Sequence, residues 1–441
     1  MMIAKERSIT IIGDNPEAIL ISVLLAETGN PNNLIGTLGS DSGDQRSVRG
    51  TEEVARLLQI HTRSGAVKKM SSTDEPQPPD LSLCFLTEHA DDASNGMRVE
   101  RQVRQLAAML RKGQTLVYSG LCSPSFTHNR LKPILEKHSG YGVGQEIGLC
   151  YVPLLWSGES VRGFRETPKL IAGLGPEHLQ RVQEVMLSMF PSLTVTSTLE
   201  TAEAGGLCAP IFREVVRALE LELAQMCMSR GVEFSSVMKV SLKTTTGGFG
   251  GPSPASGNDL VASRIFLESL GKKNRPQLVR TARRINEEAP QQVLATVKDA
   301  LAQCGRRMRR SRIAILGVEG LGLDRVNKFG DSEIIRALIR RGAIVSVYPG
   351  DTNLGLNNVV VSEGLRLKVE PDLTRAVQKA QCVIIALKPS YRESCILTPQ
   401  KLAVEMDRPA VICDLSRVME ASNVERSGLF YTSIGRGNVN T

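Results

Sequence analysis

The chain has few of the features by which stacking platforms, membrane proteins and secreted proteins are recognised. Only 4% of its 441 residues are aromatic and a single one is Trp, which argues against a surface that stacks the bases of single-stranded nucleic acid. No apolar run approaches the ~18 residues that a membrane-spanning helix needs. The N-terminal residues run directly into a strand-like segment, without the apolar core of a signal peptide. We therefore expect a cytoplasmic protein with no membrane span.

Cysteine and histidine are present but lack the spacings that signal a disulfide framework or a metal site. The nine Cys form no CxxC pair, and an odd number favours reduced thiols. The five His show neither HxxxH nor HExxH spacing, so no metal site is expected.

The charge balance is mildly positive. Lys and Arg number 54 and Asp and Glu number 46, a net charge of +8. This excess suits an anionic ligand but does not require nucleic acid as a partner. The most basic segment, RRMRRSR at 306–312, could contact nucleic acid or an acidic partner. A solvated interdomain linker is the reading that we favour, because the run falls at a predicted domain junction.

The N-terminal part alternates between strand and helix patterns. Residues 8–13 (SITIIG) read as a buried strand, and residues 16–28 read as a helix with Asn15 as N-cap and Pro16 at its first position. Residues 33–39 complete a βαβ unit, which is typical of a doubly wound sheet. Further strands are expected at 81–87 and 114–120, and further helices at 98–113 (closed by Gly113) and 128–140.

The middle of the chain is helical, and an α/β pattern resumes after it. Long helices are expected within 199–230 and 275–305. After the basic run, strands are expected at 311–317, 343–348, 381–387 and 410–416, with helices at 332–342 and 373–380. We therefore predict an α/β protein with an N-terminal Rossmann-like domain (1–198), a central helical dimerisation domain (199–305) and a C-terminal Rossmann-like domain (306–441).

This order resembles that of the UDP-glucose/GDP-mannose dehydrogenase family, and the similarity covers nearly the whole chain. EAGGLCAPIFREVVRALELELAQMC resembles the family's central helix, and TTGGFGGPSPAS resembles its glycine-rich active-site loop. Further segments that resemble the family lie at 151–173, 283–293, 413–418 and 428–437. The resemblance implies two successive NAD-dependent oxidations that convert the C6 hydroxyl of a nucleotide sugar to a carboxylate through a cysteine thiohemiacetal.

That chemistry requires a thiolate nucleophile and donors that stabilise an oxyanion. By the resemblance, the nucleophile position is Ser253, the lysine position is Gly206 and the asparagine position is Pro210. Neither Gly nor Pro offers a side-chain donor. Three further family positions are also replaced: by the resemblance, a glutamate belongs at Leu154, a threonine at Gly120 and an aspartate at Gly257. We therefore expect the catalytic groups to be missing from a matched scaffold.

The cofactor positions are altered too. The resemblance implies G-x-G-x-x-G after the first strand, but of these glycines only Gly13 is present. Asp14 and Glu17 place negative charge at a helix terminus that should attract phosphates. Thr87 and Ser119 are the other positions that the resemblance assigns to the cofactor. NAD is the implied cofactor, but we do not expect it to bind in the ordinary way.

The resemblance implies possible substrate contacts at six positions, each of which has an alternative interpretation. Phe249, Gly250 and Gly251 could cradle a sugar phosphate or form an inherited loop without function, and we favour neither. Arg213 could contact a ligand or form a structural salt bridge. A surface residue is the favoured reading for Lys328, and a loop serine rather than a surrogate nucleophile for Ser253.

Two functional hypotheses follow. The first is an inactive or retooled homologue that retains a UDP-sugar pocket or acts as a partner or regulator. It would form a homodimer, or a heteromer with an intact homologue, through the central helices. The second is an active NAD-dependent UDP-sugar 6-dehydrogenase in surface-polysaccharide precursor synthesis whose catalytic groups lie elsewhere in the sequence. A nucleic-acid-binding protein is a weaker third possibility.

Overall fold

The protein is described by a computed structural model in which the chain forms two compact units. The description covers residues 9–13, 15–36, 52–70, 82–90, 92–156, 160–241, 257–270, 276–317, 331–348, 360–361, 365–366, 368–370, 372–386 and 398–436. Unit 1 comprises residues 1–210 and 261–274, and unit 2 comprises residues 211–260 and 275–441. The three-domain boundaries at 198 and 305 remain a prediction.

Unit 1 is built on an eight-stranded sheet with the order β3-β2-β1-β4-β5-β6-β7-β8. Its strands are parallel except where β6 meets β7. The strands are β1 (Ile9–Ile12), β2 (Asn32–Ile35), β3 (Val67–Met70), β4 (Leu83–Leu86), β5 (Thr115–Tyr118), β6 (Gly148–Tyr151), β7 (Lys169–Leu174) and β8 (Leu193–Val195). The first six strands follow the doubly wound order, so the crevice for a ligand is expected at their carboxyl ends.

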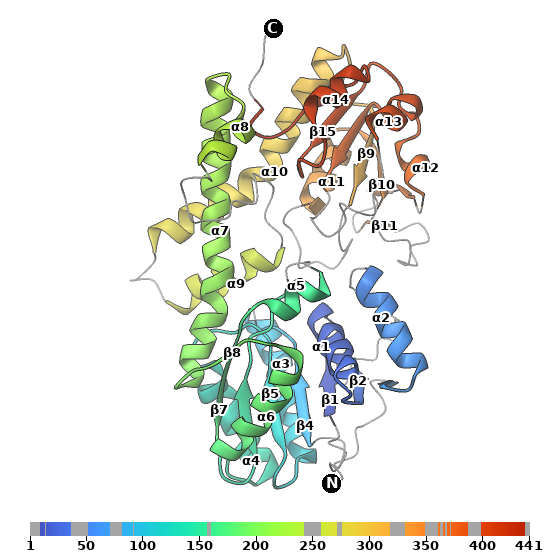
Figure 1. Cartoon of the computed structure of the whole chain (residues 1–441). Coiled ribbons are helices and arrows are strands. Elements are labelled where there is room, and N and C mark those ends of the chain that lie inside the picture. Colours follow the sequence, from blue (N-terminus) through green and yellow to red (C-terminus); the bar gives the residue numbers. More distant parts are fainter. Residues whose placement is uncertain are drawn as a thin grey trace. The chain divides into compact units, whose positions relative to one another are not determined.

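Helices cover both faces of this sheet (Figure 1). They are α1 (Pro16–Glu27), α2 (Glu52–Arg63), α3 (Ala93–Met109), η2 (Thr127–Leu131, a π-helix), α4 (Lys132–Ser139), α5 (Val161–Glu166) and α6 (Pro176–Met189). Along β1, Ile11 packs with α1 and α6 on one face, and Ile12 packs with α3 on the other. Burial on both faces explains why the strand is apolar throughout.

The central helices connect the two sheets along the chain. They are α7 (Leu199–Ser229), α8 (Phe234–Ser241), α9 (Gly257–Ser269) and α10 (Gln277–Gln303). The boundary between the two units falls within α7, after Pro210. In unit 2, Leu221 and Ala224 of α7 share an apolar cluster with Val293 and Val297 of α10.

Unit 2 contains a six-stranded parallel sheet with the order β13-β10-β9-β14-β15-β16. Its strands are β9 (Arg312–Leu316), β10 (Ile344–Tyr348), β13 (Lys368–Val369), β14 (Cys382–Ile385), β15 (Val411–Asp414) and β16 (Phe430–Thr432), and β11 (Val360–Val361) pairs separately with β12 (Leu365–Arg366). Its helices are α11 (Asp331–Arg340), α12 (Leu373–Val377), α13 (Pro399–Glu405) and α14 (Ala421–Arg426). Helices α10 and α11 pack on one face and α12 to α14 on the other.

The predicted fold class is confirmed: two Rossmann-like sheets are separated by long helices. Asn15 caps α1 and Pro16 opens it, as expected. Several helix ends were predicted wrongly: α3 begins at Ala93 rather than at Arg98, and α12 ends at Val377 rather than at Ala380. Helix α3 ends at Met109 rather than at Gly113, because Leu110 turns into an extended conformation and is buried.

Candidate active site

The carboxyl ends of three adjacent strands bring Gly13, Thr87 and Ser119 to one edge of the first sheet. Gly13 follows β1, Thr87 follows β4 and Ser119 follows β5. The Thr87 N–H donates to the Ile12 carbonyl at 3.1 Å, and the Ser119 N–H donates to the Leu86 carbonyl at 2.8 Å. The three positions that the resemblance assigned to the cofactor therefore form a continuous edge.

Gly13 is required by the geometry of this edge. Its φ of 148° lies in a region that side chains rarely adopt, and a Cβ built there would lie 2.0 Å from Thr87 Oγ1. The first glycine of the turn therefore keeps a close approach between β1 and β4.

Asn15 occupies the position of the second glycine, and its side chain fills the turn. Its Oδ1 accepts from the Ala18 N–H at 3.0 Å and from Thr87 Oγ1 at 2.8 Å. Its Nδ2 donates to the Thr87 carbonyl at 2.7 Å. The side chain thus caps the helix and joins β1 to β4. A glycine here would instead leave the backbone open to a pyrophosphate.

The next two residues also reduce the capacity of this helix terminus to bind an anion. Pro16 has no N–H to donate. Glu17 is buried, and its Oε1 accepts from the Trp156 N–H at 2.9 Å. A carboxylate in the first turn already interacts with the positive end of the helix dipole. Asp14, which we also expected to oppose phosphate binding, lies outside the described residues.

The loops after β4 and β5 are in direct backbone contact at Gly120. A Cβ at this residue would lie 1.8 Å from the Glu88 carbonyl oxygen. The threonine that the resemblance implies therefore could not be accommodated without moving one loop. Beside it, Ser119 is fully buried, and its Oγ has no hydrogen-bond partner among the described residues.

The lysine position on α7 is closed by the segment that follows β6. A Cβ at Gly206 would lie 2.6 Å from Pro153 Cβ and 3.4 Å from the Tyr151 hydroxyl. The helix can pass so close to Pro153 only because Gly206 lacks a side chain. A longer side chain at 206 would require either α7 or the Pro153 segment to move.

Two further family positions are part of the packed interior. Leu154 is fully buried in an apolar cluster of unit 1. Pro210 is buried within α7 and cannot donate the helical hydrogen bond to the carbonyl four residues earlier, which is that of Gly206.

Sequence reasoning missed Glu203, whose carboxyl group accepts three hydrogen bonds near this edge. The residue is fully buried on α7, and its carboxylate accepts the N–H groups of Ser125 and Thr127, the latter at 2.8 Å. Cys122 Sγ donates to it at 3.6 Å. Glu203 therefore caps the helix that begins at Thr127 and fastens the β5 loop to α7. The contact spans 76 residues, and no local motif marks it.

The burial of Glu203 and its neighbours raises their pKa values. Burial raises the pKa of the Glu203 carboxyl above its ordinary value, although the N–H donors act in the opposite direction. Burial likewise raises the pKa of the Cys122 thiol, and nearby Glu203 raises it further. The fully buried phenols of Tyr118 and Tyr151 also have raised pKa values because of burial. Such a thiol is not a ready nucleophile.

The remaining candidates are only partly covered by the structure. Ser253, Phe249, Gly250, Gly251 and Lys328 lie outside the described residues, and so do the surroundings of Gly257. Arg213 is half-buried on α7. Cys208, close to the vacated lysine position in sequence, is exposed.

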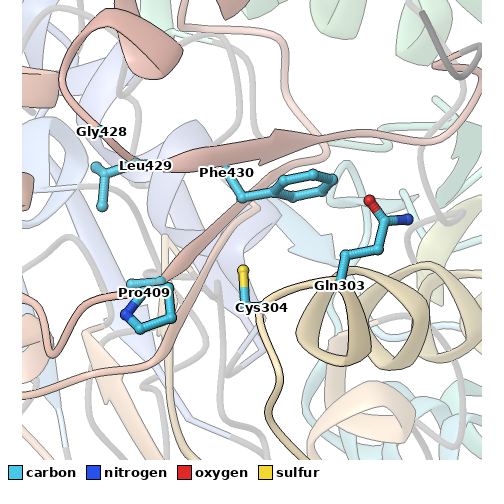
Figure 2. Close-up of a pocket in the computed structure, with 7 residues that line it drawn as sticks. Gln303, Cys304, Pro409, Gly428, Leu429 and Phe430 are labelled. Atoms are coloured by element: carbon cyan, nitrogen blue, oxygen red, sulfur yellow. The ribbon is translucent and has the colours of Figure 1, made fainter. Parts of the chain in front are cut away.

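A separate open depression of about 360 Å³ lies in unit 2 (Figure 2). It is lined by Gln303, Cys304, Pro409, Ala410, Gly428, Leu429 and Phe430. Burial raises the pKa of the Cys304 thiol, and the lining contains no carboxylate or imidazole that could act as a base. This depression therefore has no evident catalytic chemistry. Within the described part of the chain, no cluster of His, Cys, Asp and Glu could hold a metal ion.

Comparisons with known proteins point to one group of enzymes. The chain is 24% identical over 323 residues to an NDP-N-acetyl-D-galactosaminuronic acid dehydrogenase of Ralstonia solanacearum, covering 70% of this chain and 74% of that protein. It is 23% identical over 231 residues to the UDP-N-acetyl-D-mannosamine dehydrogenase of Escherichia coli, covering 50% and 55% of the two chains. The chain is a homologue of the nucleotide-sugar dehydrogenases.

Solved structures of such dehydrogenases share the fold of this homologue. A UDP-D-ManNAc dehydrogenase from Pyrococcus horikoshii superposes with a TM-score of 0.73 at 19% identity, covering 98% of this chain and all of that one. A UDP-glucose dehydrogenase from Pyrobaculum islandicum gives 0.71 at 17% identity, with 99% of each chain covered. No family model matches the chain. Among the described residues, no helix is both long enough and apolar enough to cross a membrane.

Proposed function

We propose that this nucleotide-sugar dehydrogenase homologue no longer carries out the dehydrogenase reaction and acts as a partner, regulator or nucleotide-sugar-binding protein. The observation that carries the proposal is the closed contact at Gly206. A cationic donor belongs at this position by resemblance, and even a Cβ there would lie 2.6 Å from Pro153 Cβ. A missing side chain in an open pocket could be replaced by a neighbour, whereas a position closed by packing leaves no space for a replacement.

The β1–α1 turn supports the same proposal for the cofactor. The residues present do not fit a dinucleotide bound in the ordinary mode, because Asn15 uses the Ala18 N–H and Pro16 has none to offer. The buried Glu17 carboxylate adds negative charge at the same terminus. A pyrophosphate would meet one carboxylate and few donors where it needs several donors.

The central helix supports association with a second chain. Phe212, Leu219 and Met226 lie seven residues apart on α7 and are 71%, 46% and 55% exposed. This spacing places them on one side of the helix. Ala218, Leu221 and Ala224 of the same helix are buried within unit 2. An apolar strip of this kind is suited to a homodimer, or to a heteromer with an intact homologue.

The alternative is an active NAD-dependent UDP-sugar 6-dehydrogenase in surface-polysaccharide precursor synthesis. What favours it is the retained geometry of Gly13 against Thr87, together with the dehydrogenase names of the relatives. It would require the nucleophile and the oxyanion donors to come from residues that the family does not use.

An assay of the purified full chain separates the two proposals. NADH formation is measured with NAD and, in turn, UDP-glucose, UDP-N-acetylmannosamine and GDP-mannose, with a catalytically intact relative as positive control. We expect no NADH above the background without enzyme. Steady turnover with any of these sugars would establish the active alternative. Titration of the same sugars by calorimetry then distinguishes a sugar-nucleotide-binding protein, which gives saturable heat, from a protein that binds only partners.

A further inference from the structure

The net positive charge of the chain comes entirely from unit 2. By sequence, unit 2 holds 31 Lys and Arg against 22 Asp and Glu, whereas unit 1 holds 23 against 24. A basic surface confined to one unit can direct that unit towards an anionic partner.

The basic run at 306–312 is folded onto unit 2 and is not a solvated linker between the two units. Met308 is buried, and the Arg310 N–H donates to the Gly342 carbonyl at 2.7 Å. The stem of Arg309 lies against Gly342, with its Cγ 3.1 Å from the place where a Cβ would be. These contacts hold the backbone of the run next to the start of β10.

Three arginines of this run face solvent, whereas Arg306 pairs with Asp407 at 3.3 Å and Arg312 lies close enough to Asp407 to lower the pKa of that carboxyl. Arg307, Arg309 and Arg310 are exposed and form no ion pair with any residue that the structure describes. Arg312, also exposed, begins β9 and pairs in register with Ile344 at the start of β10. We call these five residues, Arg307, Arg309, Arg310, Arg312 and Ile344, the basic edge. It lies at the amino ends of the parallel strands β9 and β10, opposite the carboxyl ends at which α/β sheets bind ligands.

Ile344 gives the basic edge an apolar element. This apolar strand residue is 57% exposed, and it pairs directly with Arg312. Guanidinium groups form bidentate contacts with phosphate oxygens. An aliphatic side chain among them can enter the boundary between lipid headgroups and acyl chains.

We propose that the basic edge is a docking surface for the anionic headgroups of a phospholipid bilayer. Lipid phosphates would bind the arginines, and the boundary between headgroups and acyl chains would take up the Ile344 side chain. A nucleic-acid backbone would account for the arginines only, and none of the five residues is aromatic and able to stack on a base.

The test is flotation of the full chain with vesicles. Vesicles of phosphatidylcholine mixed with phosphatidylglycerol are compared with vesicles of phosphatidylcholine alone, at low and at high salt. We expect binding only to the anionic vesicles, weakened by salt. Because each cation near an anionic surface contributes about a factor of five to partitioning, R307Q/R309Q should lower the partition coefficient roughly 30-fold. I344Q should lower it several-fold without changing the charge.

The matched control is R101Q/R104Q, which removes the same charge from exposed positions on α3 of unit 1. It should bind anionic vesicles like the unmodified protein, and circular dichroism should show that both double variants are folded. The proposal is overturned if the unmodified protein does not float with anionic vesicles. It is equally overturned if both double variants lose the same affinity, since net charge would then explain the effect. Binding of duplex DNA that R307Q/R309Q abolishes, in the absence of vesicle binding, would replace it with nucleic-acid binding.

Discussion

Polar side chains near the carboxyl edge of the first sheet form hydrogen bonds within the protein, whereas those at the amino edge of the second sheet are exposed to solvent. At the first, Asn15, Glu17 and Glu203 all direct their side chains to the chain's own N–H donors. At the second, Arg307 and Arg309 are exposed to solvent. In a nucleotide-binding fold the carboxyl edge is the usual ligand site. Here its donors are used to hold the unit together, and the free charge lies elsewhere.

This difference shows how a scaffold can persist while its site changes. Gly13 and Gly120 maintain close contacts between strands and loops in this chain. Filling a turn with Asn15 requires one substitution and adds hydrogen bonds that stabilise the fold. The fold can therefore be retained, or even gain stability, as ligand binding is lost.

The largest effect should come from removing the buried Glu203 carboxyl group near the first edge. E203A leaves the buried N–H of Thr127 and the half-buried N–H of Ser125 without an acceptor, so the free energy of unfolding should fall by about 3 kcal/mol. Chemical denaturation measures this value. E200A, on the exposed side of the same helix, is the control and should lose less than about 1 kcal/mol. If E203A and E200A lowered the free energy of unfolding equally, the hydrogen bonds of Glu203 to Ser125 and Thr127 would add nothing to stability.

The contact at Gly206 should be nearly as sensitive. G206A places a methyl group 2.6 Å from Pro153 Cβ, and overpacking of this kind costs about 2 kcal/mol of unfolding free energy. G36A serves as the control, because a Cβ there meets nothing within 4 Å, and it should be neutral. If G206A were also neutral, the lysine position would be open and the proposal of lost activity would lose its main support.

A smaller loss is expected at the β1–α1 turn. N15A removes the helix cap and both contacts to Thr87, which should lower the free energy of unfolding by about 1 kcal/mol. Thermal melting monitored by circular dichroism is sufficient to detect it. An unchanged melting temperature would contradict a structural role for this side chain.

The pH dependence of stability should identify Glu203 as a carboxyl that is easier to protonate in the folded chain. Its pKa is raised by burial, so folding favours the protonated form. The resulting stabilisation is present below the unfolded pKa and is lost as pH rises through the folded pKa. The stability of the unmodified chain relative to E203Q should therefore be greater at pH 5 than at pH 8. A flat or reversed difference would show that the N–H donors outweigh burial.

The smallest effect on stability is expected at the basic edge. R307Q/R309Q removes exposed side chains without ion pairs to described residues, so unfolding free energy should change by less than about 0.5 kcal/mol. Chemical denaturation of this variant and of E203A compares how much each edge contributes to the free energy of unfolding. A loss similar to that of E203A would mean that these arginines serve the fold.

The sequence predicted most of the fold but little of the geometry of the site. Helix α1 was predictable because its cap, its proline and its apolar run are all local. The segment from α5 to β8 was not, since runs such as KLIAGL in β7 fit a strand or a helix equally well. The end of α3 depends on the burial of Leu110, which no local signal reveals.

At the site, the sequence indicated which side chains are missing but not what replaces them. The resemblance to the family shows that Gly206 and Gly120 lack the side chains expected at their positions. That Pro153 and the Glu88 carbonyl close them is known only from three-dimensional packing. Glu203 and Thr127 are likewise brought together by the fold across 76 residues.

Calorimetric titration of the full chain with NAD tests the central claim most directly. If the chain's own side chains occupy the donors at the β1–α1 turn, NAD should give only heats of dilution, while an intact relative titrated in parallel binds. Saturable binding of about one NAD per chain would show that the turn accepts a pyrophosphate, and it would contradict this account.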